Sequence, residues 1–258
     1  MKVVTYSSIK GGVGKSSIAA MTANCLAASG KKVLVIDMDV NNSMSFYYLD
    51  KKGAEQAKEK NIARALGANV ESLNDYTIKT RFENIDIIAS SLELIDLRAV
   101  SERRLRNVMP TLKGYDAVII DTAPTYDNIV LNAYNASDII ITPILLTQFD
   151  YNTAEFLKKK LQSETDKYQN WWLVFNGVRG DVVNGNGSNK QSEYIQLFES
   201  SFANIVPRSA WIPRRETIKD IIDRDAKIRK SNALYEPVCN LAECFLDDEE
   251  ELNRPEVF

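Results

Sequence analysis

A glycine-rich turn near the start of the chain constrains the fold more than any other feature. Residues 10–16 read Lys-Gly-Gly-Val-Gly-Lys-Ser, after the apolar run 3–6 and before the helix-like stretch 18–21. Glycines in such a turn let backbone N–H groups point at an oxyanion, Lys15 can contact the β- and γ-phosphates, and the Ser16 hydroxyl can bind Mg²⁺. A turn with incidental lysines is the alternative, which the flanking strand and helix disfavour. The sequence therefore predicts a P-loop that binds a nucleotide through Gly11, Gly12, Val13, Gly14, Lys15, Ser16 and Ser17.

Composition excludes several kinds of site. The 258 residues contain no histidine, so imidazole acid–base chemistry and histidine metal ligation are excluded. The cysteines, Cys25, Cys239 and Cys244, include no Cys-x-x-Cys pair, which argues against a zinc site or a disulfide framework. No apolar run approaches the length of a membrane span, and the chain opens with a short strand rather than a signal peptide. We therefore expect a cytoplasmic protein.

Apolar runs recur along the chain and predict its strands. Continuous Val and Ile runs are typical of strands covered on both faces, because each face packs against helices. We expect an α/β fold, a mostly parallel, twisted sheet with helices on both faces, in a single domain over residues 1–258. The expected strands are residues 33–36, 85–88, 117–120, 139–141 and 171–175.

Local composition predicts several of the connections. Gly30 is expected to end the first helix, in which Cys25 is a small core residue. Residues 50–66 are rich in Lys, Glu and Ala and predict one exposed helix. Residues 180–190 are rich in Gly, Asn and Ser and predict a surface loop.

Three carboxylates follow predicted strands. Asp37 and Asp39 come after the run 33–36, and Asp121 directly follows the run 117–120. Ligands of a parallel sheet bind outside the carboxyl ends of its strands. There, Asp39 can orient the water that attacks a γ-phosphate or hold Mg²⁺ through water, and Asp121 can stand beside the Mg²⁺ bound by Ser16. The predicted metal site is therefore Ser16, Asp39 and Asp121, with acids that merely end a strand as the alternative.

The P-loop departs from the strict spacing in two places. Position 9, where a glycine is expected, is Ile9, and a second lysine, Lys10, directly precedes the glycine pair. This resembles the deviant Walker A loop of the ParA/MinD family of dimerising ATPases. The resemblance implies a P-loop NTPase fold, with ATP and Mg²⁺ as cofactors. It also implies a sandwich homodimer on ATP binding, in which Lys10 reaches the partner's nucleotide, and ATP hydrolysis with Lys10, Lys15 and Asp39 as catalytic residues.

Other segments extend the resemblance to the short ParA/Soj type. Residues 115–124, Tyr-Asp-Ala-Val-Ile-Ile-Asp-Thr-Ala-Pro, follow the family pattern closely. Residues 40–43, Val-Asn-Asn-Ser, replace the family's Pro-Gln-Gly-Asn, which leaves the rate of hydrolysis open. The resemblance implies that Asn176 and the backbone near Pro213 contact the adenine, with Pro207 as a rival alignment.

A basic segment stands out in a chain of net charge −3. Residues 208–230 contain eight basic and four acidic residues. The resemblance implies that this segment binds DNA without sequence preference and that a ParB-like, centromere-binding protein stimulates hydrolysis, in a protein associated with the nucleoid. A solvated helix face is the alternative. The DNA-binding residues expected are Arg208, Arg214, Arg215 and Lys219.

Other functions of related chains are less well supported. A MinD-like, membrane-associated positioning ATPase needs a basic amphipathic helix at its C-terminus, whereas residues 247–251 read Asp-Asp-Glu-Glu-Glu, which anionic lipid repels. We therefore expect no membrane partner. A redox carrier would need cysteines near Asp121, and a synthetase that acts as a monomer would not need Lys10.

Overall fold

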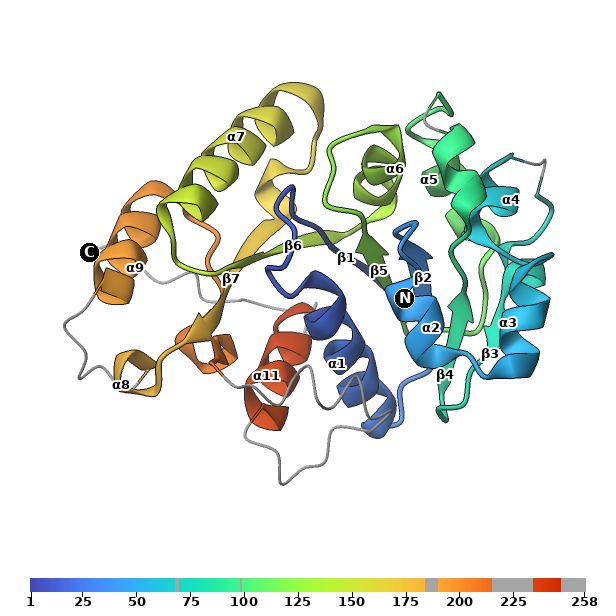
Figure 1. The fold of residues 1–258 in the computed structure, drawn as a ribbon, viewed down its shortest axis with the longest axis horizontal. Helices are drawn as coiled ribbons and strands as arrows, with labels where there is room; N and C mark the ends of the chain where they lie inside the picture. Colours follow the sequence, from blue (N-terminus) through green and yellow to red (C-terminus); the bar gives the residue numbers. More distant parts are fainter. Residues whose placement is uncertain (68–69, 98, 184–189, 215–233, 247–258) are drawn as a thin grey trace.

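The computed structural model describes residues 1–67, 70–97, 99–183, 190–214 and 234–246. Eight strands form one sheet in the order β3-β4-β2-β5-β1-β6-β7-β8 (Figure 1). Only the β3–β4 pair is antiparallel, so the expected α/β fold with a mostly parallel sheet is confirmed, and each expected strand is present. The strands are β1 (Lys2–Tyr6), β2 (Val33–Met38), β3 (Ile78–Lys79), β4 (Ile85–Ile88), β5 (Ala117–Thr122), β6 (Ile139–Ile144), β7 (Trp171–Val178) and β8 (Ile212–Pro213).

Helices connect the strands and cover both faces of the sheet (Figure 1). Among the described residues, no helix combines the length and the apolarity needed to cross a membrane. The helices are α1 (Lys15–Ala28), α2 (Ser43–Tyr48), α3 (Lys51–Ala57), α4 (Ile62–Gly67), α5 (Arg104–Val108), α6 (Asn128–Ala136), α7 (Gln148–Glu164), α8 (Gly180–Val183), α9 (Lys190–Ser201) and α11 (Tyr235–Leu246).

The core lies on both faces of the sheet because successive side chains of a strand point to opposite sides. In β2, Val33 and Val35 pack in the cluster that contains the buried side of α1 and α11. Leu34 and Ile36 pack in a second cluster with α4 and α5. All four side chains are fully buried, as expected for a continuous apolar strand between two layers of helices.

The register of the central strands brings their carboxyl ends together. Tyr6 of β1 pairs with Asp121 of β5, and Asp121 pairs with Asp37 of β2. The loops that follow these strands therefore leave the sheet at the same edge, where residues of the loop after β1 and of the loop after β2 line one pocket. The parallel fold creates its ligand site at this edge.

The prediction of one exposed helix over residues 50–66 is wrong. Two helices, α3 and α4, occupy this segment, and Ile62 and Leu66 of α4 are fully buried. The chain breaks between them because Asn61 caps the second helix: its side-chain oxygen accepts a hydrogen bond from the N–H of Arg64 at 3.0 Å. The N–H of Ile62 donates to the carbonyl of Ala89 at 2.9 Å, which fixes α4 against the sheet.

Two other local expectations have different outcomes. Gly30 adopts a positive φ of 83° and its N–H donates to Ala27 O, so it does end α1, in which Cys25 is a buried core residue. The surface loop expected over residues 180–190 is wrong at both ends, because Gly180–Val183 form the short helix α8 and Lys190 begins α9. Residues 184–189 lie outside the described residues.

Candidate functional site

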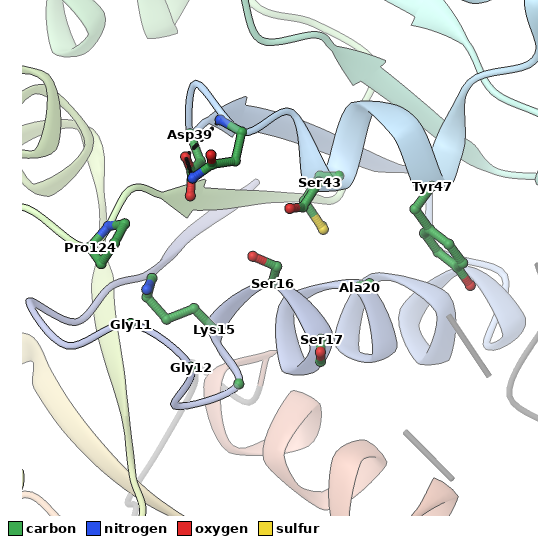
Figure 2. A pocket seen from close by; sticks show the side chains of 13 residues that line it. Gly11, Gly12, Lys15, Ser16, Ser17, Ala20, Asp39, Ser43, Tyr47 and Pro124 are labelled. Atoms are coloured by element: carbon green, nitrogen blue, oxygen red, sulfur yellow. Dashed lines mark hydrogen bonds between the residues drawn. The ribbon is translucent and has the colours of Figure 1, made fainter. Parts of the chain in front are cut away.

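A pocket of about 430 Å³ opens between the P-loop (residues 9–16) and helix α2 (Figure 2). The start of α1 forms one wall, and Asp39 with the following loop forms the other. We call this cavity the nucleotide pocket. Its lining comprises Gly11, Gly12, Gly14, Lys15, Ser16, Ser17, Ala20, Asp39, Asn41, Ser43, Met44, Tyr47 and Pro124.

The P-loop has the backbone that its sequence predicts. Gly12 and Gly14 adopt positive φ angles of 75° and 95°, a region in which a side chain is strained. At Gly14 there is no room for one either, because a Cβ would lie 2.5 Å from the side-chain nitrogen of Asn176. Val13 is fully buried and anchors the loop in the core.

Asn176, near the end of β7, holds the P-loop through its side chain. Its Nδ2 donates a hydrogen bond to the carbonyl of Val13 at 2.8 Å, and the side chain is buried. Among the described residues, Ile212 pairs with Asn176 and Pro213 pairs with Val178 across the β7–β8 ladder. Neither Asn176 nor Pro213 lines the nucleotide pocket, and the rival Pro207 is exposed just before the short 3₁₀ helix Arg208–Ala210.

Lys15 and Ser16 begin α1 and face the pocket (Figure 2). The Lys15 side chain is 7% exposed. Burial lowers the pKa of Lys15, and the carboxylates of Asp121 and Asp39 oppose this shift. A cation that is desolvated in this way gains most from a multiply charged anion, which is what a nucleotide phosphate supplies.

Asp121 is the most perturbed acid of the site. It is fully buried, and neither of its carboxylate oxygens has a hydrogen-bond partner within the described part of the chain. Burial raises the pKa of Asp121 to about 8, the charge of Asp37 adds to the shift, and the side chains of Ser16 and Lys15 oppose it. A buried carboxylate without a partner is costly, and oxygen ligands of this kind are those that Mg²⁺ prefers. The residues present therefore fit a magnesium ion.

Asp37 and Asp39 differ although they are two residues apart. Asp37 is fully buried and accepts hydrogen bonds from the N–H and the hydroxyl of Ser45, both at 2.8 Å. Burial raises the pKa of Asp37 to about 6 against these hydrogen bonds. Asp39 lines the pocket and accepts from the N–H and the side-chain amide of Asn41, both at 2.9 Å. Asp37 thus fixes α2, whereas Asp39 is available to a ligand.

Lys10 is not among the residues that line the nucleotide pocket. Its ammonium lies 2.9 Å from Oδ2 of Asp150, in the first turn of α7, and 5.3 Å from the centre of the Phe149 ring. Asp150 is 2% exposed and also accepts a hydrogen bond from the Thr147 hydroxyl, whereas Phe149 is 62% exposed. The two lysines of the P-loop therefore point to different surroundings, Lys15 to the pocket and Lys10 to α7.

Several residues of the site were not predicted from the sequence. Tyr47 and Met44 line the pocket from α2, and Pro124 lines it from the loop after β5. Asn41 comes two residues after Asp39 in the same loop, so its place in the loop is the signal that could have found it. Asp150 carries no sequence signal, since it is an isolated acid 140 residues from Lys10.

The basic residues predicted for DNA binding are only partly described. Arg208 is exposed, with its guanidinium 5.0 Å from the centre of the Trp211 ring. The side chain of Arg214 is exposed, and its N–H donates to the carbonyl of Val178 at 2.8 Å. Arg215 and Lys219 lie outside the described residues.

Comparisons with known proteins agree with this geometry. Residues 1–171 match the family model described as "AAA domain". Soj, a sporulation initiation inhibitor protein of Bacillus subtilis strain 168, is 27% identical over 255 residues, which cover 95% of this chain and 96% of that protein. The chromosome partitioning protein ParA of Caulobacter vibrioides is 27% identical over 153 residues, 56% of each chain. A candidate plasmid partition protein of Borrelia burgdorferi B31, solved with bound AMPPNP, superposes with a TM-score of 0.75 at 25% identity, covering 95% of this chain and 98% of that one.

Proposed function

The chain belongs to the AAA domain family and, within it, to the ParA/Soj-type ATPases, and from this premise we propose that it is a DNA segregation ATPase. In this proposal ATP closes two copies into a sandwich dimer, and the dimer binds DNA without sequence preference. A ParB-like protein bound at a partition locus then stimulates hydrolysis, and the dimer releases the DNA.

One observation carries the proposal: the two lysines of the P-loop face different surroundings. Lys15 lines the nucleotide pocket, whereas Lys10 lies outside it, paired with Asp150 beside the exposed ring of Phe149. A monomeric active site would have no use for a second P-loop lysine held in this way. In a closed dimer, Lys10 would exchange Asp150 for the phosphates of the partner's nucleotide and stabilise the charge that develops during hydrolysis.

The residues of the pocket fit ATP and Mg²⁺. Backbone N–H groups of Gly11, Gly12 and Gly14 would hold the phosphates together with Lys15. The Ser16 hydroxyl and Asp121 would hold Mg²⁺, which when bound neutralises charge on the phosphate oxygens. Asp39 would orient the attacking water and hold Mg²⁺ through water.

The adenine end of the nucleotide is assigned to Asn176 and Pro213. The β7–β8 ladder pairs Ile212 with Asn176, which favours Pro213 over Pro207 for this role. Ser17 and the backbone near Pro213 would complete the contacts to the nucleoside, whereas Val13 would contribute to cofactor binding through the P-loop backbone.

DNA binding is assigned to Arg208, Arg214, Arg215 and Lys219. The local excess of positive charge in an otherwise acidic chain supports it. One copy offers only a few phosphate contacts, and a dimer doubles them, so DNA affinity would report the nucleotide state.

Co-sedimentation with duplex DNA tests the proposal. We expect the protein to bind DNA with ATP and Mg²⁺ but not with ADP, and the binding to fall steeply between low and moderate salt. Lys15→Ala should abolish nucleotide binding and with it DNA binding. The double variant Arg208→Glu, Arg214→Glu should dimerise with ATP but lose DNA, and the matched variant Lys52→Glu, Lys60→Glu, with the same charge change on exposed lysines elsewhere, should bind normally.

Two outcomes would contradict the proposal. DNA binding of equal strength without nucleotide would remove the switch on which a partition cycle depends. Normal DNA binding by the arginine double variant would show that the basic segment is solvated surface.

A further inference from the structure

A second cavity lies on the side of α2 away from the nucleotide pocket. It has a volume of about 850 Å³ and is bounded by α2, α3, Arg81 and the end of β4. We call it the α2–α3 groove. Its lining comprises Asn42, Ser45, Phe46, Leu49, Asp50, Lys51, Ala54, Ala57, Lys58, Arg81, Ser90 and Ser91.

The groove presents apolar side chains to solvent. Phe46 is 86% exposed, although phenylalanine is among the residues most often buried. Leu49 lies one helical turn later and is only partly buried, and Ala54 and Ala57 of α3 extend the same lining. Single exposed apolar residues are common, but an exposed aromatic ring in an apolar hollow is typical of an interaction site.

The rim of the groove is positively charged. Lys51, Lys58 and Arg81 contribute cations, of which Lys58 lies 2.7 Å from the exposed carboxylate of Glu55, and Asp50 is the one carboxylate among the lining residues. Asp50 is occupied as the N-cap of α3, where its Oδ1 accepts a hydrogen bond from Gly53 N at 2.7 Å. Arg81 is held in place by two hydrogen bonds to the carbonyl of Tyr47. An acidic ligand is therefore favoured here, in a protein whose net charge is −3.

Two polar atoms of the lining residues are buried without a hydrogen-bond partner in the described chain. They are the hydroxyl of Ser90 and Oδ1 of Asn42. Ser90 is 6% exposed, so its hydroxyl is not satisfied by bulk water. Buried polar groups are ordinarily paired, so these two atoms can pair with an occupant only when the lining moves to expose them.

Helix α2 is a wall shared by the groove and the nucleotide pocket. Ser43 and Tyr47 line the pocket, whereas Phe46 and Leu49 line the groove. Ser45 links the two sites, because it donates to Asp37 at the end of β2 and its hydroxyl accepts from the N–H of Ser90 at 2.9 Å. A ligand that moves α2 from one side therefore changes the shape of the other.

We propose that the α2–α3 groove docks an amphipathic helical segment of a partner protein, with an apolar face on Phe46 and Leu49 and acidic residues against Lys51, Lys58 and Arg81. Short amphipathic helices commonly bind in apolar grooves of this kind. The affinity depends on the nucleotide bound on the other side of α2. The docking is independent of the proposed DNA segregation, and the coupling rests only on nucleotide binding in the pocket.

Selection from a random peptide library displayed on phage tests the docking. The full chain is the bait, and peptides that also bind Phe46→Asp are removed. We expect the enriched peptides to carry Leu or Phe at helical spacing with an excess of Asp and Glu. They should bind Lys51→Glu, Lys58→Glu at least about tenfold more weakly, since attraction between opposite charges is replaced by repulsion at two positions.

Matched variants separate docking from folding. Leu92→Asp introduces the same charge at a leucine that is 66% exposed outside the groove, and it should bind the peptides normally. Ala54→Glu narrows the groove without touching Phe46 and should weaken binding. Thermal unfolding and fluorescent ATP-analogue binding of Phe46→Asp should equal those of the wild type, because the ring is exposed.

Several results would overturn the docking: no enrichment, peptides that are basic, normal binding of the peptides to Ala54→Glu, or displacement of the peptide by duplex DNA. Self-association of the wild type that Phe46→Asp abolishes would assign the groove to a second copy instead. The coupling is tested with the tightest peptide in the presence of AMPPNP and of ADP. We expect its Kd to differ by about fivefold or more between the two, and the peptide to shift nucleotide affinity by the same factor. Equal Kd values with normal nucleotide binding would overturn the coupling alone.

Discussion

The ammonium of Lys10 lies 2.9 Å from the carboxylate of Asp150, which comes 140 residues later in the chain. The carboxylate is 2% exposed and the lysine 22% exposed, so the pair is half-sheltered from water. An ion pair of this kind fixes the lysine but is not expected to hold it permanently, because a more highly charged anion competes for it. Lys10 can therefore leave Asp150 when a second copy brings the phosphates of its bound nucleotide close to it.

Removing Lys10 should separate nucleotide binding from dimerisation. We expect Lys10→Ala to bind ATP with an affinity close to that of the wild type, because Lys15 remains in the pocket, and to stay monomeric with AMPPNP. Light scattering after gel filtration measures the mass. Lys31→Ala, which removes an exposed lysine outside the pocket, is the control. If Lys10→Ala formed a dimer with AMPPNP at the protein concentration at which the wild type does, Lys10 would have no role across an interface.

Removing the Asp39 carboxylate should trap ATP. Asp39 lies in the pocket, paired only with Asn41 of its own loop among the described residues, and we expect its loss to lower turnover by about 100-fold or more, as for other groups that activate a nucleophile. Binding and dimerisation of Asp39→Ala should persist. Phosphate release under saturating ATP measures the effect. Unchanged turnover would move the role to Asp37 or to a water positioned by backbone.

Without a bound ligand, the buried carboxylate of Asp121 should lower the free energy of unfolding. Burial raises its pKa to about 8, so between pH 4 and 8 the folded state binds more protons than the unfolded state. The stability contributed by Asp121 is therefore present at low pH and lost as the pH rises through 8. We expect Asp121→Asn to raise the thermal midpoint without nucleotide, more at pH 8 than at pH 5, and to abolish the effect of Mg²⁺ on ATP binding. Wild-type magnesium dependence in the variant would exclude Asp121 as a ligand.

The Asn176 amide should stiffen the P-loop. Replacing it by alanine removes the hydrogen bond to Val13 O and leaves that carbonyl unpaired, a loss of about 1–3 kcal/mol for a buried group. We expect Asn176→Ala to bind ATP about tenfold more weakly and to unfold at a lower temperature. Calorimetric titration and thermal melts measure both. Asn204→Ala, which removes an amide from a surface turn bonded to Tyr168 and Gln169 carbonyls, is the control and should bind ATP normally.

Local patterns were enough to predict much of this molecule. Strands β1, β2, β4, β5, β6 and β7, the P-loop and the site acids Asp37, Asp39 and Asp121 follow from runs of neighbouring residues, because buried parallel strands and phosphate-binding turns have strong local signals. The two-residue strands β3 and β8 were not predicted. The break between α3 and α4 was missed because it depends on Asn61 and on the bond from Ile62 N to Ala89, a contact between distant segments. The pairing of Lys10 with Asp150 and of Asn176 with Val13 was missed for the same reason, because each pair joins distant segments of the chain. Sequence patterns point to Lys10, Val13 and Asn176 singly but not to Asp150, and only the folded sheet brings each pair into contact.

The bond between Asn176 and Val13 also makes the two halves of the chain depend on each other. Among the described residues, those that line the nucleotide pocket all lie at or before position 124, and the family match ends at residue 171. A fragment cut there would keep these lining residues but lose β7, the strand that clamps the P-loop. Local opening of β7 would have the same effect in the intact protein. Nucleotide affinity therefore depends on whether the carboxy-terminal third of the chain is folded. A destabilising substitution far from the pocket would lower the affinity for ATP.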